Sequence, residues 1–330
     1  MKVVITGGTG FIGRMLARRL VARGELTAPS GNLETIDEIV LFDAVAPAHS
    51  IDGLDDRVRI VTGDIADCDL VRSLIDRDDV SVFHLASVVS GGGERDFDLA
   101  LKVNLTGALN VFGACRARSG RPRVVFASSL AVFGGAAMPR VVGDTTKQTP
   151  QTTYGATKAI GELLINDYTR KGFFDGRAAR LPTIIIRPGR PNLAASSFAS
   201  GVFREPLAGR TCLLPVSLST RMPVLGYRTA VEGFIALHEA DGAALGDDRA
   251  VNFPSLSVTV EEMIAALRRV AGNRPLGDIT PAPDPAIEAI VATWPVETEW
   301  TRAAALGLPV DADVDGIVRA YIEDFVDEQD

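Results

Sequence analysis

Short runs rich in valine and isoleucine alternate along the chain with longer segments of helical periodicity. The runs are apolar at both odd and even positions, which is typical of strands buried on both faces of a parallel sheet. They read KVVIT, EIVLFD, VRIVTGD, VSVFHLA, RVVFASS and PTIIIRP. The segments between them predict helices over residues 11–23, 67–77, 97–118 and 154–170. This repeated βαβ pattern predicts an α/β fold of the Rossmann type, with a doubly wound parallel sheet.

The pattern changes after Pro188, where proline and small polar residues become frequent. We therefore expect residues 1–188 to form the sheet domain and residues 189–330 to form mainly a smaller substrate-binding lobe. Residues 226–254 are expected to return to the first domain. Within the lobe, Thr259 and Glu262 have the spacing of a capping box and predict a helix that ends at Gly272.

Composition narrows the possible partners. The formal charge is -8, from 34 basic and 42 acidic residues, and no run of lysine and arginine suggests a nucleic-acid partner. No apolar run approaches the roughly 20 residues that cross a bilayer, and the apolar part of MKVVITGG is too short for a signal peptide. The 3 cysteines and 3 histidines are scattered. We expect a cytoplasmic protein with no metal site, disulfide or membrane partner.

The glycines of TGGTGFIG follow the first apolar run and precede the first predicted helix. There they let backbone N–H groups approach a pyrophosphate without an intervening Cβ. Asp43 ends the run EIVLFD, where a carboxylate binds ribose hydroxyls and repels a 2′-phosphate, so NAD is favoured over NADP. Asp43 lies 30 residues past Gly13 rather than the usual ~20. The predicted cofactor residues are Gly7, Gly10, Phe11, Ile12, Gly13, Asp43, Asp64, Ile65, Leu85, Ala86, Tyr154, Lys158 and Pro188.

Tyr154 and Lys158 are four residues apart, which places them on one face of the predicted helix. A tyrosine with a pKa near 10 supplies only about one phenolate in a thousand at neutral pH, and a nearby ammonium favours that phenolate. Ser129 ends RVVFASS and can orient a substrate hydroxyl, with Ser128 a weaker candidate. Asn104 lies inside a predicted helix, either as part of the site or as a polar position on a packed helix.

Together these residues resemble the extended short-chain dehydrogenase/reductase family, also called the NAD-dependent epimerase/dehydratases. The likeness runs through TGGTGFIG, Asp43, GDI at 63–65, HLAS, Asn104, SSLAVFG, YGATK and RPG at 187–189. The resemblance implies that Ser129, Tyr154 and Lys158 form the catalytic triad and that Asn104 joins them through a water relay. It also implies a homodimer formed through the helices at 97–118 and 154–170.

One stretch, FFDGRAARLPTIIIRPGRPNLAASSFASGVFREPL, looks like that of family members that oxidise the C2 hydroxyl of a four-carbon sugar acid with NAD. The segment RMPVLGYRTAVEG lacks the acidic residues that nucleotide-sugar enzymes usually carry there. A sugar acid needs a guanidinium to bind its carboxylate. The predicted substrate residues are Ser87, Ser128, Ser129, Arg190, Asn192, Ser196 and Arg204. Two alternatives are an NAD-dependent nucleotide-sugar epimerase or dehydratase, and a non-catalytic NAD-sensing regulator.

Overall fold

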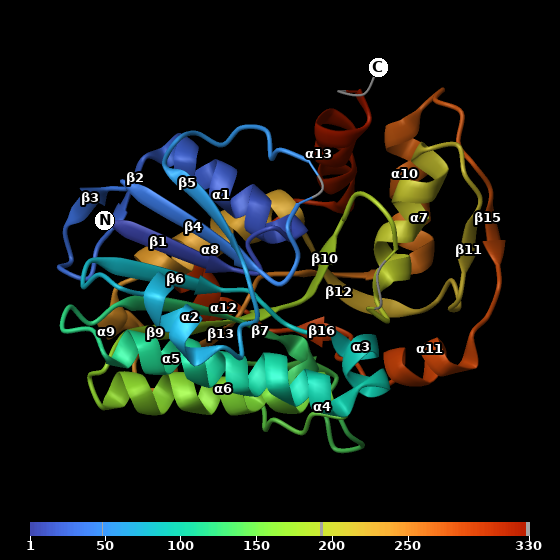
Figure 1. Ribbon diagram of the computed structural model, residues 1–330. Helices are drawn as coiled ribbons and strands as arrows, with labels where there is room; N and C mark the ends of the chain where they lie inside the picture. Colours follow the sequence, from blue (N-terminus) through green and yellow to red (C-terminus); the bar gives the residue numbers. More distant parts are fainter. Residues whose placement is uncertain (48, 192–193, 328–330) are drawn as a thin grey trace.

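A parallel sheet of seven strands dominates the computed structural model, which describes residues 1–47, 49–191 and 194–327 (Figure 1). The strand order is β13-β9-β7-β6-β1-β4-β5, and every neighbouring pair is parallel. The strands are β1 (Lys2–Thr6), β4 (Glu38–Asp43), β5 (Val58–Thr62), β6 (Val80–His84), β7 (Arg123–Ser129), β9 (Asp175–Leu181) and β13 (Ala250–Asn252). The sheet confirms the predicted α/β class. Because the winding direction reverses between β1 and β6, their carboxyl ends form the crevice where such sheets bind ligands.

Helices cover both faces of this sheet (Figure 1). One face carries α1 (Phe11–Arg23) and α8 (Tyr227–Glu239), and the other carries α2 (Cys68–Leu74), α5 (Gly107–Arg116) and α6 (Thr153–Arg170). Alternate residues of β1 serve the two layers, since Val3 and Ile5 belong to the core with α1 and α8, whereas Val4 belongs to the core with α2, α5 and α6. The inner strands β1, β6 and β7 are therefore buried on both faces, as their apolar runs predict. The run VRIVT differs because β5 is a partly exposed edge strand, and the run PTIIIRP forms a strand of the lobe, Thr183–Ile185, instead of one in the large sheet.

The predicted helix over residues 97–118 is segmented. It consists of α4 (Phe97–Ala100), the π-helix η1 (Leu101–Thr106) and α5, and the short helix α3 (Ser90–Arg95) precedes it. π-Helical turns occur frequently at functional sites. The wide turn contains Asn104, which is buried.

A second core lies in the lobe. Around the strands β10 (Thr183–Ile185), β12 (Arg221–Gly226) and β14 (Leu256–Thr259) pack α7 (Ser197–Leu207), α10 (Val260–Ala271) and α13 (Val314–Phe325). The pair β11 (Cys212–Leu214) and β15 (Ile279–Pro281) and the helix α11 (Pro285–Val291) complete the lobe (Figure 1). The capping box at Thr259 and Glu262 is present at the start of α10, and Gly272 follows its end.

The chain passes repeatedly between the lobe and the large sheet. After β12 it forms α8 and β13, which belong to the sheet layers, and α12 (Thr301–Ala305) contacts β13. β8 (Val141–Val142) pairs with β16 (Glu297–Thr298), which is far away in sequence. The Asn252 side chain joins these segments by donating to the carbonyls of Val142 and Glu299, each at 3.3 Å. Sheet and lobe are therefore interlaced.

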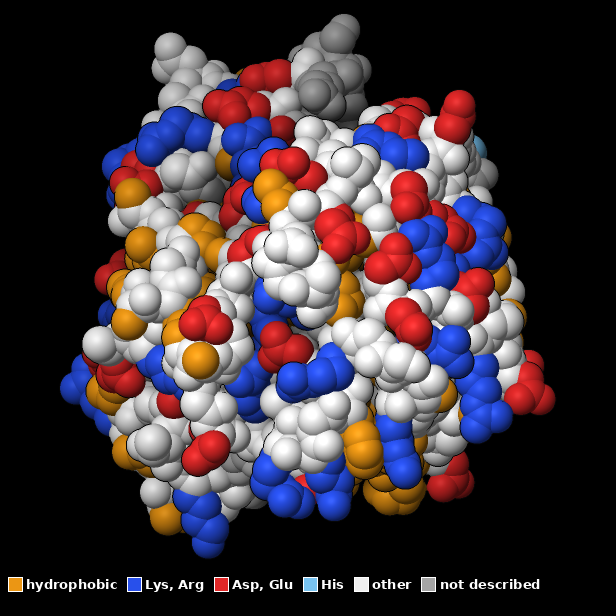
Figure 2. Space-filling model, turned by 90° about the vertical axis from the view of Figure 1, so that its left-hand side faces the viewer, with side chains coloured by type: hydrophobic (Ala, Val, Ile, Leu, Met, Phe, Trp, Pro, Cys, Tyr) orange, Lys and Arg blue, Asp and Glu red, His pale blue; other side chains and the backbone are white. Residues whose placement is uncertain are grey.

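Acidic and basic side chains are interspersed over the face that Figure 2 shows. Within the described ranges, no helix is both long and apolar enough to cross a membrane. Those ranges also hold no group of three or more His, Cys, Asp or Glu that could bind a metal ion.

Candidate active site

The glycine-rich turn between β1 and α1 packs directly against the end of β6. Gly7 has φ +69°, and a Cβ on it would lie 2.9 Å from the Ala86 nitrogen. A Cβ on Gly13 would collide with the carbonyl oxygen of Gly7. Gly10 precedes α1, and no side chain caps this helix N-terminus. The turn thus leaves backbone amides at Phe11 and Ile12 without a side-chain cap, and their contact with the cofactor remains a prediction.

Asp43 ends β4 beside this turn. Its carboxylate accepts hydrogen bonds from the backbone nitrogens of Thr9 at 3.2 Å and Ala44 at 2.8 Å. Asp43, Gly10 and Arg14 line one cavity of about 380 Å³. The unusual spacing between Gly13 and Asp43 has a simple cause, because the inserted residues form the hairpin of β2 (Glu25–Thr27) and β3 (Leu33–Thr35).

The remaining predicted cofactor residues lie in three settings. Leu85 and Ala86 donate backbone hydrogen bonds to Thr6 and border the glycine turn. Asp64 pairs with Lys102 at 2.6 Å, and this hydrogen bond holds the pKa of the Asp64 carboxyl below its usual range. The Ile65 side chain is buried in the core. Direct contact of these residues with a cofactor remains a prediction.

Tyr154, Lys158 and Ser129 meet at the junction of α6 and β7. Thr152 caps α6 by accepting from the Gly155 nitrogen at 3.0 Å, which fixes the turn that carries Tyr154. The Lys158 ammonium donates to the carbonyl of Ala127 at 2.7 Å and lies 5.4 Å from the centre of the Tyr154 ring. The Tyr154 and Ser129 side chains line the same cavity. The structure therefore brings the three predicted catalytic side chains together.

Burial dominates the electrostatics of this cluster. It lowers the pKa of Lys158 to about 7, although the charge of Glu162 opposes the shift. Burial raises the pKa of Tyr154, and the hydrogen bond with Ser129 opposes that shift. Burial disfavours the charged forms of both side chains, the Tyr154 phenolate and the Lys158 ammonium. The protein groups by themselves therefore do not favour the Tyr154 phenolate.

Asn104 ties the loop after β6 to α6. Its amide nitrogen donates to the Val88 carbonyl at 3.0 Å and to the Thr157 hydroxyl at 3.2 Å. Its amide oxygen accepts from the Val88 nitrogen at 2.7 Å and from the Ser87 hydroxyl at 3.1 Å. Thr157 lies between Tyr154 and Lys158 in the sequence of α6, so Asn104 connects α6 with this loop. The Ser87 hydroxyl is occupied by the same network.

Ser129 and Tyr154 line a cavity of about 210 Å³, together with Ser196 from the lobe. Sequence reasoning missed several of its walls. Thr152 contributes a hydroxyl-bearing side chain, and Trp294 lines the cavity from a distant part of the chain. Residues 181–184 also line it, where β9 ends and β10 begins. The sequence could have indicated residues 181–184 because they lie at the end of a strand. No local sequence pattern indicates that Trp294 lines the cavity.

Other predicted residues lie elsewhere. Pro188, Arg190 and Arg204 line a second cavity, which shares no described lining residue with the one around Tyr154. Ser128 faces away from Ser129, as adjacent strand residues must, and its hydroxyl donates to Glu162. Asn192 lies outside the described residues. Whether Arg190 or Arg204 binds a substrate carboxylate therefore remains a prediction.

A buried ion pair lies one helical turn beyond Lys158. Arg180 contacts the Glu162 carboxylate at 2.8 Å, and Gln148 and Ser128 donate to the same carboxylate. Arg180 also donates to the Asp144 carbonyl at 2.8 Å. The network fixes α6 against the ends of β7 and β9. Glu162 continues the four-residue spacing of Tyr154 and Lys158, which is the signal by which the sequence could have revealed it.

The chain is similar to proteins of known family and to solved structures. Residues 3–250 match the family described as the NAD dependent epimerase/dehydratase family. A D-erythronate dehydrogenase of Cupriavidus necator is 50% identical over 325 residues, 98% of each chain. One from Haemophilus influenzae is 41% identical, covering 98% of this chain and 99% of its own. A crystal structure described as a nucleoside-diphosphate-sugar epimerase from Agrobacterium tumefaciens superposes with a TM-score of 0.90 at 39% identity, over 99% of this chain and 95% of that one.

Proposed function

The chain belongs to the NAD dependent epimerase/dehydratase family, and on that premise we propose that it oxidises the C2 hydroxyl of D-erythronate to a 2-oxo acid with NAD. The observation that carries this proposal is the 50% identity to a D-erythronate dehydrogenase over 98% of both chains. The catalytic cavity supports it. At about 210 Å³ the cavity is smaller than the roughly 300–1,000 Å³ of sites for drug-sized ligands, which favours a small substrate.

Tyr154 is the general base in this proposal. Its phenolate takes the proton of the C2 hydroxyl while Ser129 holds the same oxygen in place. NAD, when bound, would supply the acceptor for the hydride of C2 and a positive ring that favours the phenolate. Lys158, when protonated, places positive charge 5.4 Å from the centre of the Tyr154 ring. The products are the ketone, NADH and one proton.

The residues around the glycine turn fit the cofactor. Side chains at Gly7 and Gly13 would collide with the neighbouring backbone, so these glycines keep the turn tight, and the uncapped start of α1 supplies amide donors for the pyrophosphate. Asp43 would accept from the ribose hydroxyls.

A nucleotide-sugar epimerase is the second candidate, because the Agrobacterium tumefaciens structure carries that description at 39% identity. An epimerase returns the hydride to its substrate and releases no net NADH. The two functions therefore differ in a measurable product.

The test is NADH formation by the purified protein with NAD and a panel of four- to six-carbon aldonates and uronates, with UDP-sugars and NADP as comparators. We expect turnover with D-erythronate and little with the longer acids. If no acid gives NADH formation and a UDP-sugar is epimerised, the proposal is contradicted and the second candidate is established.

We further propose a cytoplasmic homodimer. Exposed apolar side chains gather on α4, α5 and α6, the helices at the bottom of Figure 1. They are Phe97, Leu99, Leu109, Ile160 and Leu163. Single exposed apolar residues are common, but a group on adjoining helices indicates a protein–protein contact. The three cysteines are free, as is usual for proteins of a reducing compartment.

A further inference from the structure

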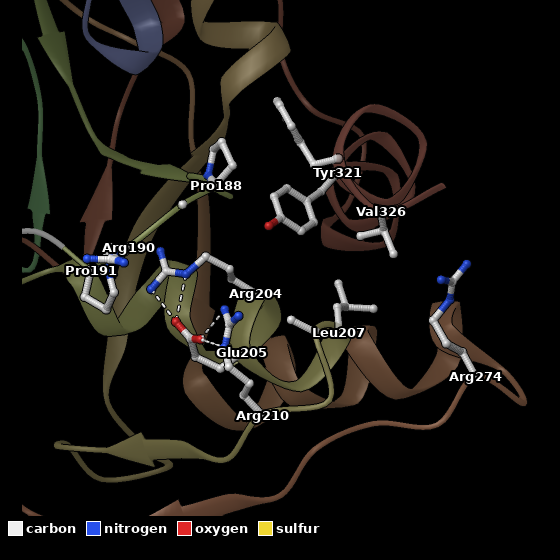
Figure 3. A pocket seen from close by; sticks show the side chains of 13 residues that line it. Pro188, Arg190, Pro191, Arg204, Glu205, Leu207, Arg210, Arg274, Tyr321 and Val326 are labelled. Atoms are coloured by element: carbon white, nitrogen blue, oxygen red, sulfur yellow. Dashed lines mark hydrogen bonds and ion pairs between the residues drawn. The ribbon is translucent and has the colours of Figure 1, made fainter. Parts of the chain in front are cut away.

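A second cavity, of about 860 Å³, lies between the loop at 188–191, the C-terminal half of α7 and α13 (Figure 3). Four arginines line it, namely Arg190, Arg204, Arg210 and Arg274. Glu205 is the only acidic residue among its described lining residues. Four guanidinium groups thus face one carboxylate, which leaves a strong excess of positive charge.

The ion pairs do not remove this excess. Arg204 and Arg210 share Glu205, each donating from its Nε at 2.8 Å (Figure 3). Arg274 pairs with Asp327 at 2.6 Å. Arg190 has no ion pair or side-chain hydrogen bond with any residue that the structure describes. The positive charge of the cavity also acts on Arg187, because burial and the charge of Arg204 lower the pKa of the Arg187 guanidinium.

At the cavity, one buried guanidinium nitrogen and the hydroxyl of a buried tyrosine side chain have no hydrogen-bond partner among the described residues. Tyr321 is 5% exposed, and its hydroxyl points toward Arg204 (Figure 3) without a hydrogen bond to any described residue. Arg204 is 3% exposed, and its Nη2 atom makes no hydrogen bond. This Nη2 atom lies 2.7 Å from the Glu205 carboxylate, but the contact is an ion pair without hydrogen-bond geometry. Buried tyrosine hydroxyls and guanidinium nitrogens are normally satisfied. A ligand with several acceptor oxygens would satisfy both.

We propose that this cavity binds a small molecule bearing a phosphate monoester, at a site separate from the catalytic cavity. A phosphate monoester carries about -1.5 to -2 charges and three acceptor oxygens, which matches clustered guanidinium groups better than a single carboxylate does. The Tyr321 hydroxyl would donate to one of these oxygens. The large volume leaves room for the organic part of the ligand.

The two cavities share one connecting segment. Residues 188–191 line the phosphate site, whereas Ala194 and Ser196, a few residues later, line the catalytic cavity. The described lining residues of the two cavities are therefore neighbours along the chain. We expect bound phosphate to change the KM for the substrate that the enzyme oxidises. Phosphate binding itself can be tested whichever sugar acid that substrate is.

The test is calorimetric titration of the whole protein with inorganic phosphate and with 3-phosphoglycerate, with and without saturating NAD. We expect both anions to bind, and Tyr321→Phe and Arg274→Gln each to weaken binding tenfold or more. Arg72→Gln is the matched control, because Arg72 is a largely exposed arginine on the distant helix α2. Its binding should equal that of the unchanged protein.

Three outcomes would overturn the proposal. They are the absence of binding, equal binding by the Tyr321→Phe and Arg274→Gln variants, and competitive displacement of phosphate by D-erythronate or NAD. Displacement would assign the cavity to the substrate or cofactor site. Dehydrogenase turnover is measured separately, so failure here is distinguishable from failure of the proposed activity.

Discussion

At the scale of single residues, the Tyr154 hydroxyl is the group expected to carry the proton in catalysis. Tyr154→Phe removes that hydroxyl and leaves the ring beside Lys158. General base catalysis contributes about 10²–10⁴-fold, so kcat should fall by at least this factor while the Kd for NAD stays within about twofold. Tyr168→Phe, on the same helix, is the control and should retain activity. A Tyr154→Phe protein with most of its turnover would contradict the mechanism.

Asp43 should determine the choice of cofactor. Asp43→Asn removes the charge that repels a 2′-phosphate, and Arg14 in the same cavity remains to attract it. Like charges in contact cost several kcal/mol, so the ratio of kcat/KM for NAD over NADP should fall tenfold or more. Asp69→Asn, on exposed α2, should leave the ratio unchanged. An unaltered ratio in Asp43→Asn would show that the ribose lies elsewhere.

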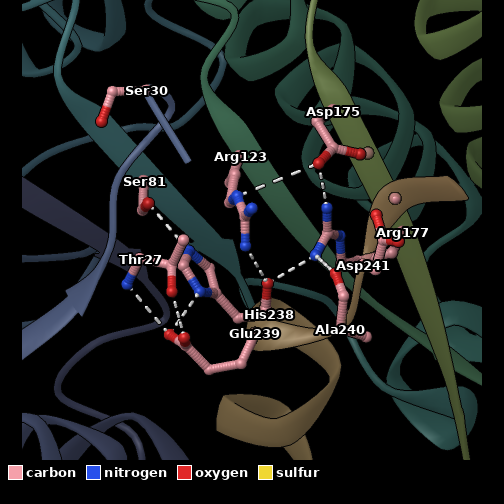
Figure 4. Close-up of polar contacts among 12 residues, drawn as sticks. Thr27, Ser30, Ser81, Arg123, Asp175, Arg177, His238, Glu239, Ala240 and Asp241 are labelled. Atoms are coloured by element: carbon pink, nitrogen blue, oxygen red, sulfur yellow. Dashed lines mark hydrogen bonds and ion pairs between the residues drawn. The ribbon is translucent and has the colours of Figure 1, made fainter. Parts of the chain in front are cut away.

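At the scale of elements, two arginines satisfy the C-terminus of α8 (Figure 4). Arg177 is fully buried, and its Nη1 donates to the carbonyls of Leu237 and Ala240, each at 3.1 Å. Arg123 donates to the His238 carbonyl at 2.8 Å. The last carbonyls of a helix lack intrahelical partners, and positive charge there is favourable. The contacts attach α8 to β7 and β9.

Removing Arg177 should therefore destabilise the whole fold. Arg177→Met leaves buried carbonyls and part of the Asp175 charge without their partner. We expect the free energy of unfolding in urea to fall by about 3 kcal/mol, since each buried unsatisfied group costs about 1–3 kcal/mol. Arg170→Met removes an exposed arginine of α6 and serves as the reference, with little change expected. A loss below about 1 kcal/mol for Arg177→Met would refute this role.

The elements that the sequence predicted well are those whose pattern is local. The run KVVIT and the helix over 11–23 follow from hydrophobic periodicity and the glycine turn alone. The π-helix at Asn104 has no such signature, because it depends on hydrogen bonds to the loop at 87–88. Trp294 lines the cavity around Tyr154, and Arg204 lines the second cavity, because of how the lobe folds in three dimensions. Local sequence patterns do not specify that tertiary arrangement.

At the scale of the molecule, two buried histidines make stability depend on pH. Burial lowers the pKa of His84 to about 3 and that of His238 to about 4, so both are neutral in the folded protein at neutral pH. Unfolded histidines take up protons below about pH 6.5. Unfolding therefore consumes protons, and the free energy of unfolding should decrease as the pH falls from about 6.5 to about 4.

For His238 alone the loss should reach about 3 kcal/mol near pH 4. Urea midpoints between pH 7 and pH 4.5 measure it. His238→Gln should make the dependence less steep, whereas His49→Gln, at an exposed position, should not. A His238→Gln protein with the same slope would contradict the assignment.

The proposed dimer is tested on the same scale. Leu163, on α6, is 64% exposed. Leu163→Glu would place a charge in the apolar contact, so sedimentation should show a shift from dimer to monomer. Leu213→Glu is a matched control because Leu213 is 65% exposed on β11, away from these helices. A dimer that persists in Leu163→Glu would place the contact elsewhere.

The interlacing of sheet and lobe limits how the protein can move. β8 pairs with β16, and Asn252 connects two segments that are distant in sequence, so the halves share strands and hydrogen bonds. Rotation about a hinge would break these bonds. Cofactor exchange should therefore proceed by displacement of short surface segments, on a body that melts cooperatively as one unit. For the same reason, neither half would fold if produced alone.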